Sequence, residues 1–304
     1  MKVIEPNTID YTSITSSIPE DSAAVWDSAT TYAADAVVRI GMYLYKSLQA
    51  SNTGHNPPQT LSGLDAWWRR TGPTNKAAMF DDKLYTKSIA PEGVGTLTVT
   101  VPWTRATTSF AILAMEDVSS VSIEIKNTAG TVFFSKTYGM VYGVKNWWQY
   151  YSGSFTRKTE IVEVAPSPMI TGTITAIFTG GRPEVGHFMT GRPWEIGATL
   201  YGVTPEIVDY SQYSVDDFGE TTIVKRAFAK RYSGELYLHP SQADSTFNRL
   251  VLLRGKPCLW IGDNRTTSEG GFECLNAFGY FKRAPLAFKG PNEAQYSMEI
   301  EGMI

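Results

Sequence analysis

Among the groups in this sequence that could do acid–base chemistry are three pairs of adjacent carboxylates and two isolated histidines. They are Asp81-Asp82, Glu116-Asp117, Asp216-Asp217, His187 and His239. Hydrolysis of a glycosidic bond needs two carboxylates about 5 to 9.5 Å apart on one groove, whereas neighbouring residues of a chain point in different directions. We therefore expect solvated turn carboxylates and structural histidines.

The sequence contains none of the short motifs that carry a known mechanism. There is no strand–turn–helix G-x-S-x-G, no G-x-x-x-x-G-K-[ST], no helix-opening G-x-G-x-x-G and no H-E-x-x-H. The two cysteines, Cys258 and Cys274, and the three histidines show no zinc-binding spacing. We expect no enzymatic activity, no cofactor and no metal site, and we expect both cysteines to be free buried thiols.

Composition narrows the classes of partner. The formal net charge of the 304 residues is -3, and 19% of them are charged, against a usual share of about 25%. A chain without a basic stripe is a poor polyanion binder, so nucleic acid is not expected as the main partner. The longest apolar stretch, residues 110–115, is far shorter than the roughly 20 residues of a membrane span. We expect no membrane insertion, no signal peptide and synthesis in a cytoplasm.

Six aromatic residues gather within about 45 residues and are interleaved with turn-forming residues: Trp26, Tyr32, Tyr43, Tyr45, Trp67 and Trp68. Aromatic rings can stack on the apolar faces of sugars. A unit this small also needs aromatic side chains to supply most of its buried area. Both interpretations stay open: a sugar-binding or docking surface, or the core of a compact three-stranded module.

These residues lie in a pattern that resembles the chitin-binding type of carbohydrate-binding module, families 5 and 12, over about residues 23–75. The segments that carry the resemblance are 26–38, 41–47, 52–57 and 67–72. Ala34 stands where those modules prefer Gly, and Leu48 and Gln49 stand where chitin binders tend to carry exposed aromatics. The resemblance implies a glycan-binding module or a module reused for docking.

The elements that would position these groups are mostly strands. Leu97, Val99 and Val101 alternate with threonines, and Val121, Ile123 and Ile125 alternate with polar residues before a turn at 127–130. One helix is expected after residue 241, where Ser241 precedes an acidic residue by three positions and Gly255 ends the apolar spacing.

We therefore predict a mainly β protein. It comprises an N-terminal arm (1–22) ordered against a neighbour, the aromatic module (23–75), a jelly-roll-like β-sandwich (76–182) and a small α+β or β-barrel domain with one helix (183–304). A near-duplication of Gly-Arg-Pro at residues 181–183 and 191–193 suggests two similar turns at the last boundary.

Residues 183–304 combine the single helix with the segments Asp209-Tyr210-Ser211, Phe218-Gly219, Val224-Lys225-Arg226 and Met298-Glu299-Ile300-Glu301-Gly302. In this pattern they resemble minor tail and distal-tail proteins of tailed bacteriophages. The resemblance implies a structural protein of a tail tip or baseplate in the virion, assembled in the host cytoplasm. Its partners would be other tail proteins, further copies in a homo-oligomeric ring and possible host-surface glycan. Candidate assembly contacts are Trp147, Trp148, Arg182 and Arg192. The alternatives are an accessory protein that binds chitin or cell-wall glycan, and a polysaccharide-cleaving enzyme.

Overall fold

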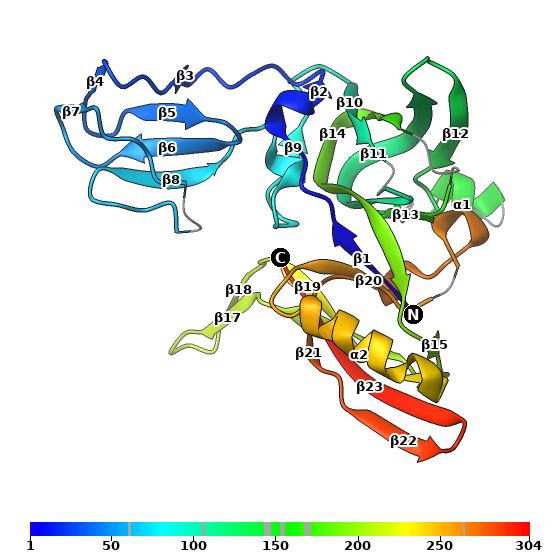
Figure 1. Cartoon of the computed structure of the whole chain (residues 1–304). Coiled ribbons are helices and arrows are strands. Elements are labelled where there is room, and N and C mark those ends of the chain that lie inside the picture. The colour runs from blue at the N-terminus through cyan, green and yellow to red at the C-terminus, as the bar shows by residue number, and fades with distance from the viewer. Residues whose placement is uncertain (60–61, 105–106, 143–146, 153–155, 167–170, 264) are drawn as a thin grey trace.

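The computed structural model describes all residues except 60–61, 105–106, 143–146, 153–155, 167–170 and 264. The chain is mainly β, as predicted, and β-sandwich-like in character. One continuous sheet of 15 strands runs through the N-terminal segment, the middle and the C-terminal part of the chain, and smaller sheets lie outside it. Figure 1 shows the aromatic module at one end, joined to the rest by two chain segments.

The middle of the chain builds the largest hydrophobic cluster. Its strands are β9 (Ser88–Ile89), β10 (Thr96–Trp103), β11 (Ser109–Asn127), β12 (Val132–Gly139), β13 (Ile161–Val164) and β14 (Gly172–Glu195), with β2 (Thr15–Ser16) beside β10. Leu97, Val99 and Val101 are fully buried while the threonines between them face outward. The period-2 pattern therefore predicted the buried face of β10.

Strand β14 runs straight through the predicted boundary at residue 183 and through both Gly-Arg-Pro repeats, which form no turns. Its glycines serve close backbone approach instead: a Cβ on Gly180 would lie 1.8 Å from the carbonyl oxygen of Asp117, and one on Gly191 would lie 2.4 Å from that of Glu5. Pairing with β11 shifts register on either side of Val118, which bends the two long strands together.

The first residues are not an arm awaiting a neighbouring chain. Strand β1 (Lys2–Pro6) pairs with β14 on one side and with β20 (Cys258–Ile261) on the other, and so closes the sheet between the middle and the C-terminal part. Val3 and Ile4 are fully buried, and Ile4 packs with Leu113, Met189 and Phe278. The neighbouring residues give no sign of this pairing, because both partners of β1 are more than 180 residues away in the sequence.

The C-terminal part combines strands with one helix. Its strands are β15 (Ala198–Thr199), β16 (Thr204–Asp209), β17 (Gln212–Val215), β18 (Thr221–Val224), β19 (Phe228–Leu238), β20, β21 (Asn276–Arg283), β22 (Leu286–Gly290) and β23 (Glu293–Gly302). Helix α2 (Ala243–Leu252) follows a 3-10 turn and packs Leu250 into this core. His239, and not the expected Ser241, caps this 3-10 turn. Its side chain accepts a hydrogen bond from the Ser241 N–H.

The aromatic module is a separate small sheet in the order β3-β5-β6-β8, with β4 and β7 paired beside it. The bounds are β3 (Ala24–Val25), β4 (Thr31–Tyr32), β5 (Val37–Ile40), β6 (Tyr43–Ser47), β7 (Asn52–Thr53) and β8 (Trp68–Pro73). Three strands were expected, and this sheet has a fourth, because the two-residue β3 pairs in parallel with β5.

A second helix, α1 (Trp147–Ser152), spans six residues where a connection was expected. No helix in the described part of the chain is long and apolar enough to span a membrane.

Candidate functional site

Three of the six candidate sugar-binding rings form the core of the module. Tyr32, Tyr45 and Trp68 are buried and pack with Val38, and Tyr32 meets Trp68 edge-on at 5.4 Å between ring centroids. Their polar atoms bond within the module: Tyr45 donates to the carbonyl of Pro58 at 3.0 Å, and the Trp68 indole N–H to the carbonyl of His55 at 2.6 Å. These rings hold the module together.

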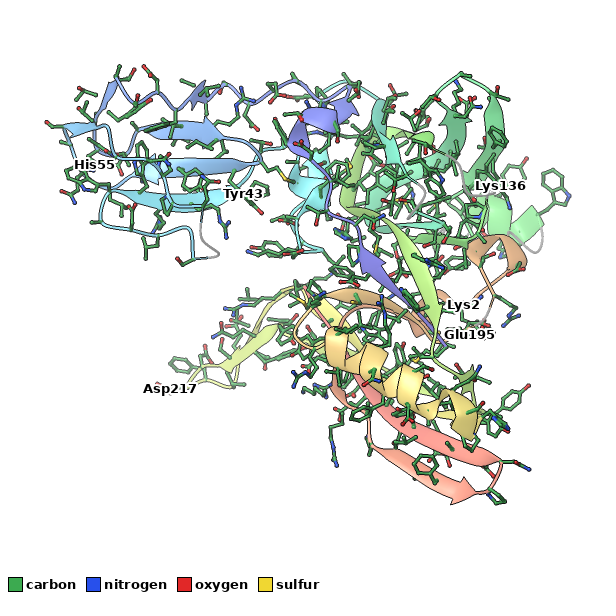
Figure 2. The ribbon with its side chains drawn as sticks, in the orientation of Figure 1. Lys2, Tyr43, His55, Lys136, Glu195 and Asp217 are labelled. Carbon is green, nitrogen blue, oxygen red and sulfur yellow. The ribbon has the colours of Figure 1, made fainter. Side chains whose placement is uncertain are left out.

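The other three rings, Trp26, Tyr43 and Trp67, are partly exposed at the margin of this core. Trp67 stacks on His55 with 3.8 Å between centroids, and the Arg70 guanidinium lies 4.4 Å from the Tyr43 ring. Tyr43 opens β6 and pairs with Pro73, whereas Trp67 precedes Trp68, which pairs with Ser47 at the other end of β6. Figure 2 shows Tyr43 and His55, on which Trp67 stacks, toward opposite ends of the module. The two rings therefore do not form one stacking platform.

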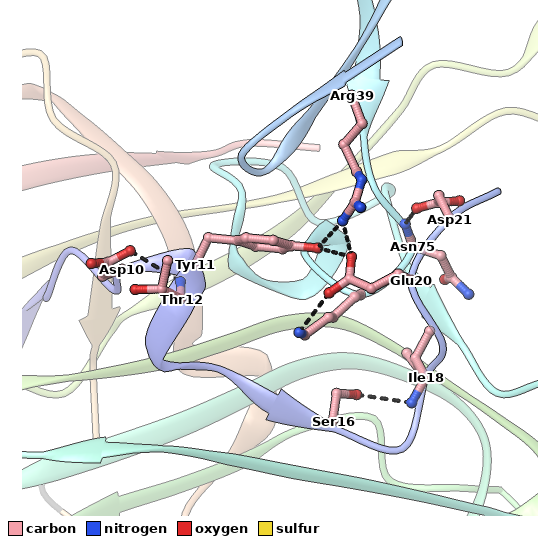
Figure 3. A network of polar contacts seen from close by, with 10 residues as sticks. Asp10, Tyr11, Thr12, Ser16, Ile18, Glu20, Asp21, Arg39 and Asn75 are labelled. Carbon is pink, nitrogen blue, oxygen red and sulfur yellow. Dashed lines mark hydrogen bonds and ion pairs between the residues drawn. The ribbon is translucent and has the colours of Figure 1, made fainter. Parts of the chain in front are cut away.

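A polar cluster, here called the clasp, fastens the module to the rest of the molecule (Figure 3). The carboxylate of Glu20, on the segment that enters the module, accepts hydrogen bonds from Tyr11, Arg39 and Lys76. Burial alone would raise the pKa of Glu20, but the hydrogen bonds from Tyr11 and Lys76 and the charges of Lys76 and Arg39 lower it. Glu20 therefore remains ionised at neutral pH.

A second contact fixes the exit of the module beside the clasp. Asn75 donates from its backbone N–H to Asp21 at 2.8 Å, and its side-chain amide exchanges hydrogen bonds with both backbone groups of Ile89. The entering and leaving segments are thus joined to each other and to β9. Four polar residues of the two segments, Glu20, Asp21, Asn75 and Lys76, therefore help to position the module.

The candidate assembly residues lie in α1 and at two separate positions of β14. Trp147 and Trp148 in α1 are 75% and 79% exposed, as is Tyr151 at 78%, and Trp147 stacks on Tyr151. These side chains are thus exposed at the surface rather than buried in the body. Large aromatic side chains grouped in water are typical of contact surfaces.

The two candidate arginines both make contacts within the chain. The Arg182 guanidinium donates to the carbonyl of Ala90 at 3.1 Å, and its backbone N–H donates to Asp117. The Arg192 guanidinium lies 5.3 Å from the Trp194 ring, on which Arg249 also stacks. Both residues are exposed, but Arg182 has a clear structural role.

Sequence reasoning missed the hairpin β17–β18. All eight residues of its strands are exposed, and it pairs with no other strand among the described residues. Figure 1 shows it projecting from the C-terminal part, and Figure 2 marks Asp217 at its end. A signal was present: Tyr213 and Val215 alternate with polar residues before the turn at 216–220.

Several titratable groups singled out from the sequence are engaged in hydrogen bonds or ion pairs within the chain, or are buried in its core. Asp81 accepts hydrogen bonds from Thr86 and from the backbone of Lys83, and Asp117 accepts from Arg157 and Arg182. Glu116 pairs with Lys87 at 2.5 Å. His187 is buried, and burial lowers its pKa to about 4, so the ring is neutral at pH 7.

Both cysteines are free, as expected, but Cys274 is exposed and only Cys258 is buried. Burial raises the pKa of Cys258 to about 12. Within the described part of the chain, no three side chains of the metal-binding types come together.

Comparison with models of known protein families gives no match, and comparison with curated protein sequences gives no match either.

Proposed function

We propose that this protein is a non-enzymatic structural component of a bacteriophage tail tip or baseplate, located in the virion tail and assembled in the host cytoplasm. The observation that carries the proposal is that α1 and the β17–β18 hairpin hold large apolar side chains in water, outside the four hydrophobic clusters. Contiguous exposed apolar surface marks contact sites between proteins. It supports partners among other tail proteins and further copies in a ring.

The aromatic module would have one of two roles in such a particle. Its core rings are buried and stabilise its fold. Its partly exposed rings, Trp26, Tyr43 and Trp67, lie at separate places on the margin of that core. The clasp holds it at a fixed position on the body. This arrangement suits a docking platform, and it leaves the face of Trp67 that does not stack on His55 for contact with host-surface glycan.

Electron microscopy and mass spectrometry of tailed particles from cells that make the chain test the proposal. The chain should copurify with the particles in a fixed ratio to other tail proteins, and gold-labelled antibody against residues 23–75 should mark the far end of the tail. Recovery of the chain only as free protein, with none in the particles, would overturn the role.

The second candidate is an accessory protein that binds chitin or cell-wall glycan, which the partly exposed Trp67 ring favours. It predicts heat on titrating the full chain with chitin oligomers or host glycans. A matched titration with Trp67→Ala separates the ring's contribution from that of the rest of the module. Absence of heat with every glycan would leave the docking role.

A further inference from the structure

The β17–β18 hairpin has one apolar face with no core beneath it. The register pairs Tyr213 with Ile223 and Val215 with Thr221, so these four side chains share a face of the ribbon. Tyr213, Val215 and Ile223 are 62%, 66% and 62% exposed. An isolated two-stranded hairpin is marginally stable in water, so burial of this face against a partner would stabilise it.

The end of the hairpin presents one ring between carboxylates. Asp216 accepts hydrogen bonds from the backbone N–H groups of Phe218 and Glu220 and so fixes the turn, in which Gly219 has a φ of +84°. Phe218 is 96% exposed. Asp217 and Glu220 flank it, and no described cation lies within ion-pair distance of either carboxylate.

A cavity of about 380 Å³ at the base of the hairpin has an apolar lining that would suit a ring such as Phe218. Apolar side chains from distant segments line it, among them Leu113, Met115, Phe228, Phe278 and Met303. Its volume is within the range of sites that accept a ligand-sized apolar group.

The charges at the rim of this cavity leave two cations available. Glu116 pairs with Lys87, and Glu160 pairs with Lys230, so these carboxylates are already compensated. Lys225 and Arg226 are exposed, and no described carboxylate lies within ion-pair distance of them. Hydrogen bonds from Ser211 and the charge of Lys225 lower the pKa of Asp209, so the base of the hairpin holds two cations against this one carboxylate, whereas its end is acidic.

The end of a hairpin lies away from the cavity of its own chain. The ladder from the Gln212–Val224 pair to the Val215–Thr221 pair alone extends about 10 Å, and the turn continues outward from the body (Figure 1). Hydrogen bonds from Arg226 to Gln212 and to Ser211 hold the base in place. Phe218 can therefore fill such a cavity only in another molecule.

We propose that the β17–β18 hairpin of one copy docks into this cavity of a second copy, with Phe218 in the apolar interior and Asp217 and Glu220 against Lys225 and Arg226. The contact is head-to-tail, so each copy offers a hairpin and accepts one, and repetition closes a ring or extends a filament. This inference rests on the proposed structural role, to which it gives an interface and a direction of assembly.

Charge reversal on each side of the contact tests the pairing. The first variant carries Asp217→Lys with Glu220→Lys and keeps Asp216, which fixes the turn. The second carries Lys225→Glu with Arg226→Glu. Each variant alone places like charges together, so sedimentation should show association weakened by about tenfold or more. An equimolar mixture should restore it, because each hairpin then meets a cavity of opposite charge.

The control variant, Glu92→Lys with Glu293→Lys, changes the net charge as the first variant does, at exposed carboxylates elsewhere. It should associate like the wild type. Circular dichroism of every variant verifies that folding is intact. Failure of the mixture to restore association would overturn the pairing, as would a wild-type chain that stays monomeric at about 1 mM.

A photo-reactive p-benzoylphenylalanine in place of Phe218 locates the docking site directly. In a mixture with isotope-labelled wild-type chain, cross-links should join the two isotopic forms at peptides that contain Met115, Phe228 or Met303. Cross-links within one chain, or to another surface of the second copy, would overturn the proposal. These results leave the tail role to be judged separately, by the presence of the chain in particles.

Discussion

The Lys76 ammonium donates to the Glu20 carboxylate at 2.9 Å across the two segments that connect the module to the body. Glu20 precedes the first strand of the module and Lys76 follows the last, so this contact brings the entry and exit of the module together. Arg39, from β5 within the module, joins the same carboxylate. One side chain thus couples the module to both of its connections.

Replacement of Glu20 with Gln should loosen the module without unfolding it. The neutral amide cannot pair with two cations, whereas the aromatic core of the module is untouched. We expect faster proteolytic cleavage on either side of residues 23–75 and a larger radius of gyration in small-angle scattering. Glu92→Gln, at an exposed carboxylate with no described partner, is the matched control and should change neither. Unchanged cleavage in Glu20→Gln would show that the clasp does not hold the module.

The same carboxylate makes the attachment of the module to the rest of the molecule dependent on pH. The pKa of Glu20 lies below its ordinary value of 4.5 in the folded chain. The stabilisation is therefore fully present above pH 4.5 and is lost as the pH falls through the lowered value. Small-angle scattering from pH 7 to pH 3 should show the molecule extending at the acidic end, and Glu20→Gln should be extended throughout. Equal profiles for the two chains would contradict this assignment.

Shortening of Ile4 should destabilise the middle and C-terminal parts together. Ile4 is fully buried among residues of β11, β14 and β21, so Ile4→Ala should cost about 2 to 5 kcal/mol of the free energy of unfolding. Chemical denaturation followed by tryptophan fluorescence measures it. Val25→Ala, at an exposed strand position, should cost less than about 0.5 kcal/mol. A comparable loss in both variants would argue against a core role for β1.

The elements that the sequence predicted well are those whose signals are local. The alternation of Leu97, Val99 and Val101 depends on which side of a strand faces the core, and that period is written in consecutive residues. The signals for helix α2, Ser241 and Gly255, likewise lie within a span of 15 residues. Of Phe247, Leu250 and Val251, which stand at helical spacing, only Leu250 is buried.

The features that were mispredicted depend on distant partners. The polar residues around β1 gave no pattern, because its order comes from β14 and β20, which lie far along the chain. The Gly-Arg-Pro repeats resembled turns, yet Gly191, and Gly180 just before the first repeat, admit a neighbouring backbone. No local rule distinguishes these uses of glycine. The aromatic residues of the module were found, but the sequence could not divide core rings such as Trp68 from marginal ones such as Trp67.

That division predicts different outcomes for two adjacent tryptophans. Trp68 is fully buried and bonded to His55, so Trp68→Ala should cost about 3 to 5 kcal/mol and unfold the module, which scanning calorimetry of the full chain would show as a lost or shifted transition. Trp67→Ala removes a half-buried ring stacked on His55 and should cost less. Because His55 covers one face of Trp67, we expect that loss in stability or assembly rather than in sugar affinity. Abolished glycan binding with unchanged stability and assembly would instead identify Trp67 as a sugar-stacking residue.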